Sequence, residues 1–265
     1  MIELCGRGIS LRAARGPRAF AIATRVAPHG GLEPFLFRTY EHAPLSSARA
    51  RAGEAADADL EGGGAAADGP VAGTSHAALW KAVEATSAAP LYFPRSRLRG
   101  MHFADGGLVA NDPTIVALRE ARAQWPTRRI GLVLSLGSGA PRPAEDEAVA
   151  RAVAAADPRA RYIRLQPIVR GVSPIDADEP KLRAMEERAR EFFRASPAAD
   201  EACGLLRTSR GGGVWAAAAR AVRRRGAWWR ARFDGSISGT MAAWASATVV
   251  AHHRCRGWAA HWGIA

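Results

Sequence analysis

The residues of this 265-residue chain whose types and spacing best suit chemistry are Asp105, Gly106 and Gly107. A carboxylate can accept a proton from a weak nucleophile, and burial makes it a stronger base by raising its pKa. Two glycines directly after it let backbone approach the carboxylate without a Cβ atom in the way. The same tripeptide forms turns in every fold class, so by itself it indicates either a catalytic base or a turn.

A carboxylate base needs a nucleophile, such as a serine held in a Gly-x-Ser-x-Gly turn between a strand and a helix. The segment 73–77, GTSHA, begins like this turn but lacks the final glycine, and we interpret Thr74 and Ser75 as a helix cap. The segment 235–239, GSISG, also holds serines between glycines, but it follows Asp105 and no apolar strand precedes it. The sequence therefore offers a candidate base without a credible serine nucleophile.

The three cysteines, Cys5, Cys203 and Cys255, are too few and too scattered for a disulfide framework. Histidines upstream of Asp105 are dispersed, and none pairs with a cysteine or carboxylate at metal-ligand spacing. We expect no cofactor, no metal site and a reducing, intracellular compartment.

The elements that must position Asp105 follow from the hydrophobic pattern. Two short apolar runs with β-branched members, 19–26 and 34–40, predict strands, with turn residues at 28–31 between them. From 46 to 73 the chain has almost no large apolar residue. Such a segment cannot bury enough surface to offset its ordering entropy, which predicts a disordered insertion or long surface loop.

Three helices are expected. The first begins at the Thr74-Ser75 cap and is ended by Pro90, and the second begins at Asp112-Pro113 and ends at Trp125. The third runs from about 178 to 196, and we expect its apolar stripe to pack against a sheet. That stripe is formed by Leu182, Met185, Ala189 and Phe192.

The segment 129–136, RIGLVLSL, is almost continuously apolar. This pattern is typical of a strand buried on both faces of a parallel sheet. Strands and helices in alternation predict an α/β layered fold.

Three segments together resemble the patatin-like phospholipase family. They are LWKAVEATSAAPLYFP at 79–94, FADGGLVANDP at 103–113 and LVLSLGSG at 132–139. The resemblance covers about Phe20 to Phe193 apart from the insertion, and it is greatest to the calcium-independent phospholipases of the family. It implies a three-layer α/β fold with a mostly parallel sheet.

In that family a serine in a G-x-S-x-G elbow attacks an ester carbonyl, and the aspartate of the Asp-Gly-Gly segment is its base. The resemblance therefore implies that Asp105 is the proton acceptor and that Gly106 and Gly107 complete the motif. The family's elbow and oxyanion loop precede this aspartate, and neither is found upstream here. We expect an N-terminally incomplete fold, in which 1–203 form the C-terminal part of a catalytic domain.

The formal charge of +12 lies mostly in the segment 204–265, which has ten arginines and one acid. Nearly all basic residues are arginine and alanine is abundant, as G- and C-rich coding DNA would produce, so the charge does not argue for nucleic-acid binding. We expect a poorly ordered tail. Its Trp228 and Trp229 beside arginines would suit peripheral contact with an anionic membrane.

The expected function is hydrolysis of acyl esters in phospholipids or other lipids, with the serine supplied by sequence absent from this chain. The alternative is a catalytically inactive lipid-binding or regulatory protein. No signal peptide and no apolar run of about 20 residues is visible, so we expect a protein in the cytoplasm or peripheral to an organelle membrane.

Overall fold

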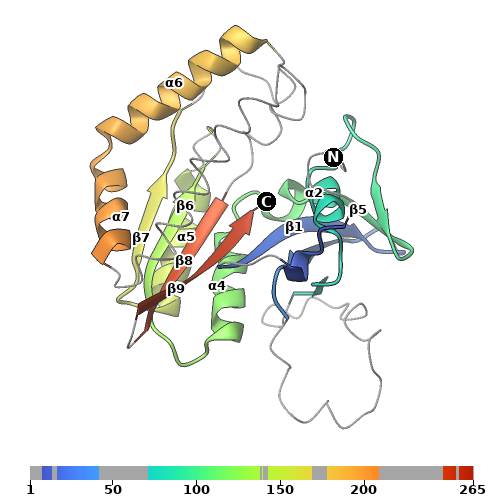
Figure 1. Cartoon of the computed structure of the whole chain (residues 1–265), viewed down its shortest axis with the longest axis horizontal. Coiled ribbons are helices and arrows are strands. Elements are labelled where there is room, and N and C mark those ends of the chain that lie inside the picture. Colours follow the sequence, from blue (N-terminus) through green and yellow to red (C-terminus); the bar gives the residue numbers. More distant parts are fainter. Residues whose placement is uncertain are drawn as a thin grey trace. The chain divides into compact units, whose positions relative to one another are not determined.

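The computed structural model describes residues 8–13, 17–41, 71–137, 139, 143–168 and 178–208, and the backbone of 247–254 and 257–264. The chain divides into two compact units, residues 1–127 with 261–265, and residues 128–260. Both contain strands and helices, so the predicted α/β class is confirmed (Figure 1). The boundaries of 1–203 and 204–265 remain predictions.

Strand β1 (Arg18–Val26) is the centre of the first unit. Strand β2 (Leu32–Arg38) runs antiparallel along one edge of β1, with Ile22 opposite Leu36. Both strands expected here are present. The turn between them is closed by the Gly30 amide, which donates to the Ala27 carbonyl at 2.8 Å, and Gly30 has a φ of 82° that suits glycine.

The other edge of β1 is shared by two strands. Residues 18–21 pair in parallel with β9 (Gly257–Ile264), and residues 23–26 pair antiparallel with β5 (Met101–Asp105). Further out, β3 (Gly73–Thr74) is parallel to β2, and β4 (Ser96–Leu98) forms a hairpin with β5. The expectation of a mostly parallel sheet is confirmed only in part, since antiparallel and parallel pairs are mixed.

The first unit also contains the 3₁₀ turn η1 (Leu11–Ala13) and helix α2 (Leu79–Thr86). The predicted cap of this helix is wrong. Thr74 belongs to β3, its hydroxyl accepts a hydrogen bond from the His76 amide at 3.1 Å, and the residue preceding α2, Ala78, makes no side-chain cap. Pairing with β2 extends the backbone at Thr74, so the chain cannot turn into a helix there. Helix α2 also ends before Pro90, at Ser87.

Helix α4 (Thr114–Gln124) agrees closely with its prediction. The Asp112 carboxylate accepts a hydrogen bond from the Thr114 amide at 2.9 Å, so it satisfies one of the free amides at the start of the helix. At the other end Trp125 closes the last turn by donating its amide to the Ala121 carbonyl. Between Asp105 and α4 lies a short helix that was not predicted, α3 (Gly107–Ala110).

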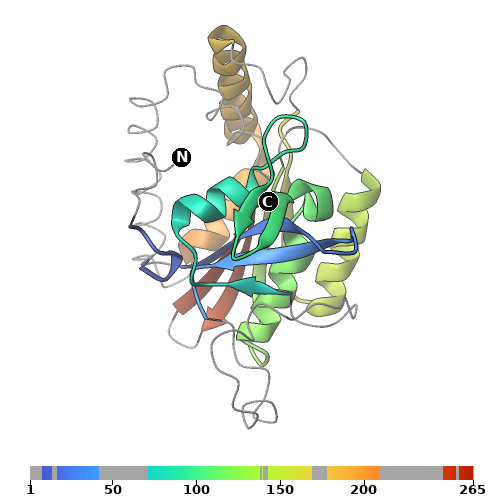
Figure 2. The same ribbon diagram turned by 90° about the vertical axis from the view of Figure 1, so that its right-hand side faces the viewer.

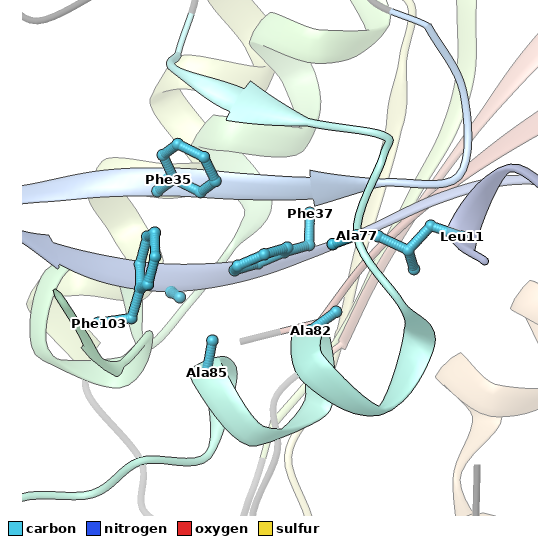
Figure 3. Packing of buried hydrophobic residues seen from close by; sticks show 8 residues of the cluster. Leu11, Phe35, Phe37, Ala77, Ala82, Ala85 and Phe103 are labelled. Atoms are coloured by element: carbon cyan, nitrogen blue, oxygen red, sulfur yellow. The ribbon is translucent and has the colours of Figure 1, made fainter. Parts of the chain in front are cut away.

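Three phenylalanines form the centre of the first unit's core. Phe35 and Phe37 alternate along β2 and so point to the same face, where they meet Phe103 of β5 with ring centroids 5.0 to 5.5 Å apart (Figure 3). Ala82 and Ala85 of α2 pack against this cluster. Small residues at these positions let α2 approach the rings closely.

A buried ion pair joins β2 to α4. The Arg38 guanidinium donates two hydrogen bonds to the Glu120 carboxylate at 2.7 and 2.8 Å, and both side chains are almost fully buried. The Tyr40 hydroxyl donates to the same carboxylate at 2.7 Å. Burial, together with the negative Glu120, raises the pKa of Tyr40, so its hydroxyl stays protonated as a donor.

In the second unit, β6 (Ile130–Leu136) is parallel to β7 (Arg161–Leu165) and antiparallel to β8 (Ala247–Arg254). Five of its seven residues are buried, as the apolar run predicted. Two helices that were not predicted, α5 (Pro143–Ala156) and α7 (Pro197–Thr208), both contact β7.

Helix α6 (Glu179–Ala195) has the predicted bounds but not the predicted packing. None of its residues is buried, and the four apolar residues of its stripe are only partly covered. Its charges are satisfied within the helix by pairs such as Glu179 with Arg183 and Glu186 with Arg190. Helical periodicity fixes which residues share a face, but whether another element covers that face depends on the tertiary structure.

Candidate functional site

The predicted proton acceptor, Asp105, is the last residue of β5. The chain then turns directly into α3, and the Gly106 carbonyl accepts hydrogen bonds from the amides of Val109 at 3.2 Å and Ala110 at 3.0 Å. Asp105 therefore lies where a strand meets the N-terminus of a helix. All three residues of the predicted motif fall within this junction.

The backbone around Asp105 is held from two sides. Its amide donates to the Ala88 carbonyl at 2.9 Å, and its carbonyl accepts a hydrogen bond from the Thr24 hydroxyl at 2.6 Å. The Gly106 amide donates to the Thr86 carbonyl at 3.2 Å. The end of α2 and strand β1 thus fix the position of the aspartate.

Glycine is required at position 106 because of a close backbone contact. A Cβ atom there would lie 2.1 Å from the carbonyl oxygen of Ile22, too close for any side chain. That carbonyl also accepts a hydrogen bond from the Thr86 hydroxyl, so it cannot move away freely. At position 107 a Cβ would lie 3.0 Å from the Asp105 carboxylate, so the second glycine leaves room for the functional group itself.

The Asp105 carboxylate is half-buried, and its Oδ1 accepts a hydrogen bond from the Gly107 amide at 2.7 Å. Burial raises the pKa of Asp105, and the Gly107 amide opposes part of this rise by stabilising the charged form. Within the described residues Oδ2 accepts no hydrogen bond. The geometry combines a fixed carboxylate oxygen with a second one available to a proton donor, as a general base requires.

The GTSHA serine, Ser75, cannot serve this base. It directly follows β3, and the strands of this part of the sheet lie in the order β3, β2, β1, β5. With a spacing of about 4.8 Å between strands, three steps put β3 roughly 14 Å from β5. A serine and its base must lie within about 3 Å of each other. The GSISG segment at 235–239 and the Trp228-Trp229 pair lie outside the described residues.

Two threonines that hold the aspartate in place, Thr24 and Thr86, were not predicted from the sequence, and neither was the β4–β5 hairpin that carries it. A signal for the hairpin was present, since Arg99-Gly100 separates two short runs of alternating character. Both turn residues have positive φ, 47° and 78°, as in the tight turns favoured by hairpins. The two threonines act through contacts between distant segments, for which the sequence carries no local signal.

In the described part of the chain, no group of three or more histidine, cysteine, aspartate or glutamate side chains could hold a metal ion. Among the same residues, no helix is both long and apolar enough to cross a membrane.

Comparison with known proteins gives a consistent result for the segment that contains the site. Residues 16–118 match the family model described as patatin-like phospholipase. The chain is 31% identical to phospholipase A I of Arabidopsis thaliana over 135 residues, which are 46% of this chain and 10% of that protein. It is 29% identical to calcium-independent phospholipase A2-gamma of Oryctolagus cuniculus over 140 residues, and to its Homo sapiens counterpart over 139 residues.

The matched regions are 52% and 51% of this chain and 15% of each of the two gamma proteins, so the chain spans a small part of the relatives that it matches. No solved structure gives a significant match. The matched segment 16–118 includes β1, α2, β5 and Asp105 with its two glycines, so the part of the chain that holds the candidate site is similar to the patatin-like phospholipase family.

Proposed function

We propose that this chain supplies the aspartate of a lipid acyl hydrolase that cleaves ester bonds by a serine–aspartate dyad. Asp105 is the proton acceptor, and the substrates are phospholipids or other lipid esters. The observation that carries the proposal is the environment of Asp105, a half-buried carboxylate of raised pKa at a strand–helix junction inside the matched family segment.

The chemistry follows from the residues at the junction. A serine hydroxyl becomes a nucleophile when a base removes its proton as it attacks the ester carbonyl. A raised pKa makes the Asp105 carboxylate a better acceptor than an exposed aspartate, whose pKa is near 4. The Gly107 amide fixes one carboxylate oxygen while the other takes the proton. The dyad requires neither a metal ion nor a cofactor.

Within the described residues, no serine hydroxyl hydrogen bonds to Asp105. Because the sequence upstream of Asp105 contains no G-x-S-x-G elbow, we assign the nucleophile, its elbow and the oxyanion loop to sequence outside this chain. The corresponding fold is a three-layer, patatin-like α/β fold with a mostly parallel sheet, and this chain forms its C-terminal part. This assignment predicts that the adjoining upstream coding sequence encodes the glycine-rich loop and the elbow in frame.

The test compares the 265-residue chain with a version extended to include that upstream sequence. The extended protein is expected to hydrolyse p-nitrophenyl butyrate and to react with a fluorophosphonate probe for activated serines, and Asp105→Asn should abolish both. The 265-residue chain alone should do neither. Upstream sequence without an elbow, or full activity in the extended Asp105→Asn variant, would overturn the proposal.

The second candidate is a catalytically inactive lipid-binding or regulatory protein. It is favoured by two observations: among the described residues no serine hydroxyl hydrogen bonds to Asp105, and large apolar side chains are exposed close to the site. Binding of the 265-residue chain to lipid vesicles, with no hydrolysis by the chain or by its upstream extension, would support this alternative. Peripheral membrane contact is compatible with both candidates.

A further inference from the structure

The segment between α2 and β5 carries three exposed large apolar or aromatic side chains in succession, and Leu91 is the most exposed of those described in the first unit. Leu91 is 100% exposed, Tyr92 51% and Phe93 40%. In both Figure 1 and Figure 2 this segment leaves the strands as a long excursion before returning through β5. Large apolar residues that are exposed together indicate a surface that contacts another apolar phase or partner.

The backbone holds these side chains outward. Leu91 has a φ of 72°, a conformation that a leucine rarely adopts because its Cβ is crowded. The turn is fixed by the amides of Tyr92 and Phe93, which donate to the Ala89 carbonyl at 3.2 and 2.9 Å. A strained leucine that buries none of its side chain contributes little to this fold, so its position points to a function.

Positive charge lies directly beside this apolar tip. Arg95, Arg97 and Arg99 are all exposed, and the sequence from 85 to 104 contains no acidic residue. The acid facing the hairpin from α2 is Glu84, which pairs with Lys81 at 2.7 Å and accepts a hydrogen bond from Ser96 at 2.8 Å. Its charge is therefore already balanced.

From this arrangement we propose that residues 91–99, the docking segment, bind the surface of an anionic phospholipid bilayer. Leu91, Tyr92 and Phe93 enter the boundary between headgroups and acyl chains, where aromatic and aliphatic side chains are favoured. The three arginines pair with lipid phosphates, for which the planar guanidinium is well suited. An acidic protein partner would use the charge but would leave the exposed leucine and phenylalanine unexplained.

The docking segment is connected to the candidate site at both ends. At its start, Ala88 accepts the hydrogen bond of the Asp105 amide and Ala89 holds the turn of the tip. At its end, Arg99 precedes Asp105 by six residues on the same hairpin. Docking would thus hold the strand of the proposed base at a lipid surface. The inference builds on the proposed lipid-ester function but concerns binding alone.

The experiment is flotation of the 265-residue chain with vesicles of ether-linked phosphatidylcholine, with or without ether-linked phosphatidylglycerol. Ether lipids cannot be hydrolysed as esters, so binding is measured independently of catalysis, and Asp105→Asn should bind like the unaltered chain. We expect binding to the anionic vesicles that weakens as salt is raised. Binding by the 265-residue chain, together with no ester hydrolysis by the version extended with its upstream sequence, would contradict the proposed function and leave this inference standing.

Variants of the tip and of the arginines test the two parts of the docking segment. Leu91→Ser and Phe93→Ser should each weaken binding roughly tenfold. Replacing Arg95, Arg97 and Arg99 by glutamine should weaken binding to anionic vesicles by about fivefold per residue. The apolar control is Ile9→Ser, which removes a side chain that is 48% exposed at the opposite end of α2.

The charge control replaces three exposed arginines of the second unit by glutamine, with the same change of net charge: Arg151, Arg183 and Arg190. Both controls should bind as the unaltered chain does. The inference would be overturned if the docking-segment variants bound vesicles as well as the unaltered chain does. It would also be overturned if variants and controls lost binding equally. Either result would place binding elsewhere, such as in the tail.

A second measurement reports insertion at the tip itself. An environment-sensitive fluorophore is attached at Leu91→Cys, with Cys5, Cys203 and Cys255 changed to serine. We expect a blue shift and a rise in emission on anionic vesicles, and no change for the same label at Ile9→Cys. No spectral change at position 91 while the labelled chain is bound to vesicles would refute insertion of the docking segment.

Discussion

Two groups of large apolar side chains in the first unit have opposite surroundings. Phe35, Phe37 and Phe103 are at most 1% exposed, whereas Leu91 and Phe93, close to Phe103 in sequence, are 100% and 40% exposed. The phenylalanines of the core lie on paired strands, where alternation directs them to the face covered by α2. Leu91 and Phe93 lie in an unpaired turn between Pro90 and Pro94. Burial is thus determined by strand pairing, not by hydrophobicity alone.

The sharpest way to test this comparison is to remove one ring from each group. Phe103→Ala should lower the free energy of unfolding by about 3–5 kcal/mol, because it leaves a cavity against Phe35 and Phe37. Phe93→Ala should change it by no more than about 0.5 kcal/mol. Urea unfolding followed by circular dichroism measures both. Equal losses would mean that the docking segment is part of the core.

A similar loss in the free energy of unfolding is expected when a buried ion pair is broken, in contrast to an exposed one. Glu120→Ala removes the partner of buried Arg38 and the acceptor of Tyr40, which should cost about 3–5 kcal/mol. The exposed pair of Glu179 and Arg183 is screened by solvent, so Glu179→Ala should leave the unfolding midpoint unchanged. A stable Glu120→Ala variant would show that β2 and α4 do not depend on this ion pair.

A smaller effect is expected at the junction next to the core. Gly106→Ala places a methyl group against the Ile22 carbonyl and should destabilise the protein by about 1–3 kcal/mol. Gly8→Ala, where a Cβ meets nothing within 4 Å, is the control and should be nearly neutral. Thermal unfolding distinguishes the two. An unchanged melting temperature for Gly106→Ala would contradict the close approach of β1 to this junction.

The smallest effect concerns the charge of Asp105 and depends on pH. Burial raises its folded-state pKa above the unfolded value of about 4, so the protonated form favours folding and stability falls as pH rises through the folded pKa. Asp105→Asn carries no charge at any pH, so its stability relative to the unaltered chain should increase across this window and then become constant. Denaturation between pH 4 and pH 8 measures this difference, with the exposed Asp178→Asn as control. A relative stability that fell as pH rose would show that the site favours the charged carboxylate.

Sequence patterns located several elements whose structure depends mainly on neighbouring residues. The apolar runs located β1, β2 and β6, helical periodicity and Asp112-Pro113 located α4, and the Asp-Gly-Gly motif located the candidate site. Each follows from backbone periodicity or from the conformational preference of a few adjacent residues. The family resemblance was confirmed by the match at 16–118.

Tertiary structure alone decided the features that depend on which distant segments meet. Thr74 lies in a strand because it pairs with β2. Helix α6 has the predicted apolar stripe, but none of its described residues is buried. Gly106 is required because β1 passes close to it, and Asp105 has a raised pKa because the surrounding chain buries it. Such contacts join residues far apart in sequence, and no local pattern records them.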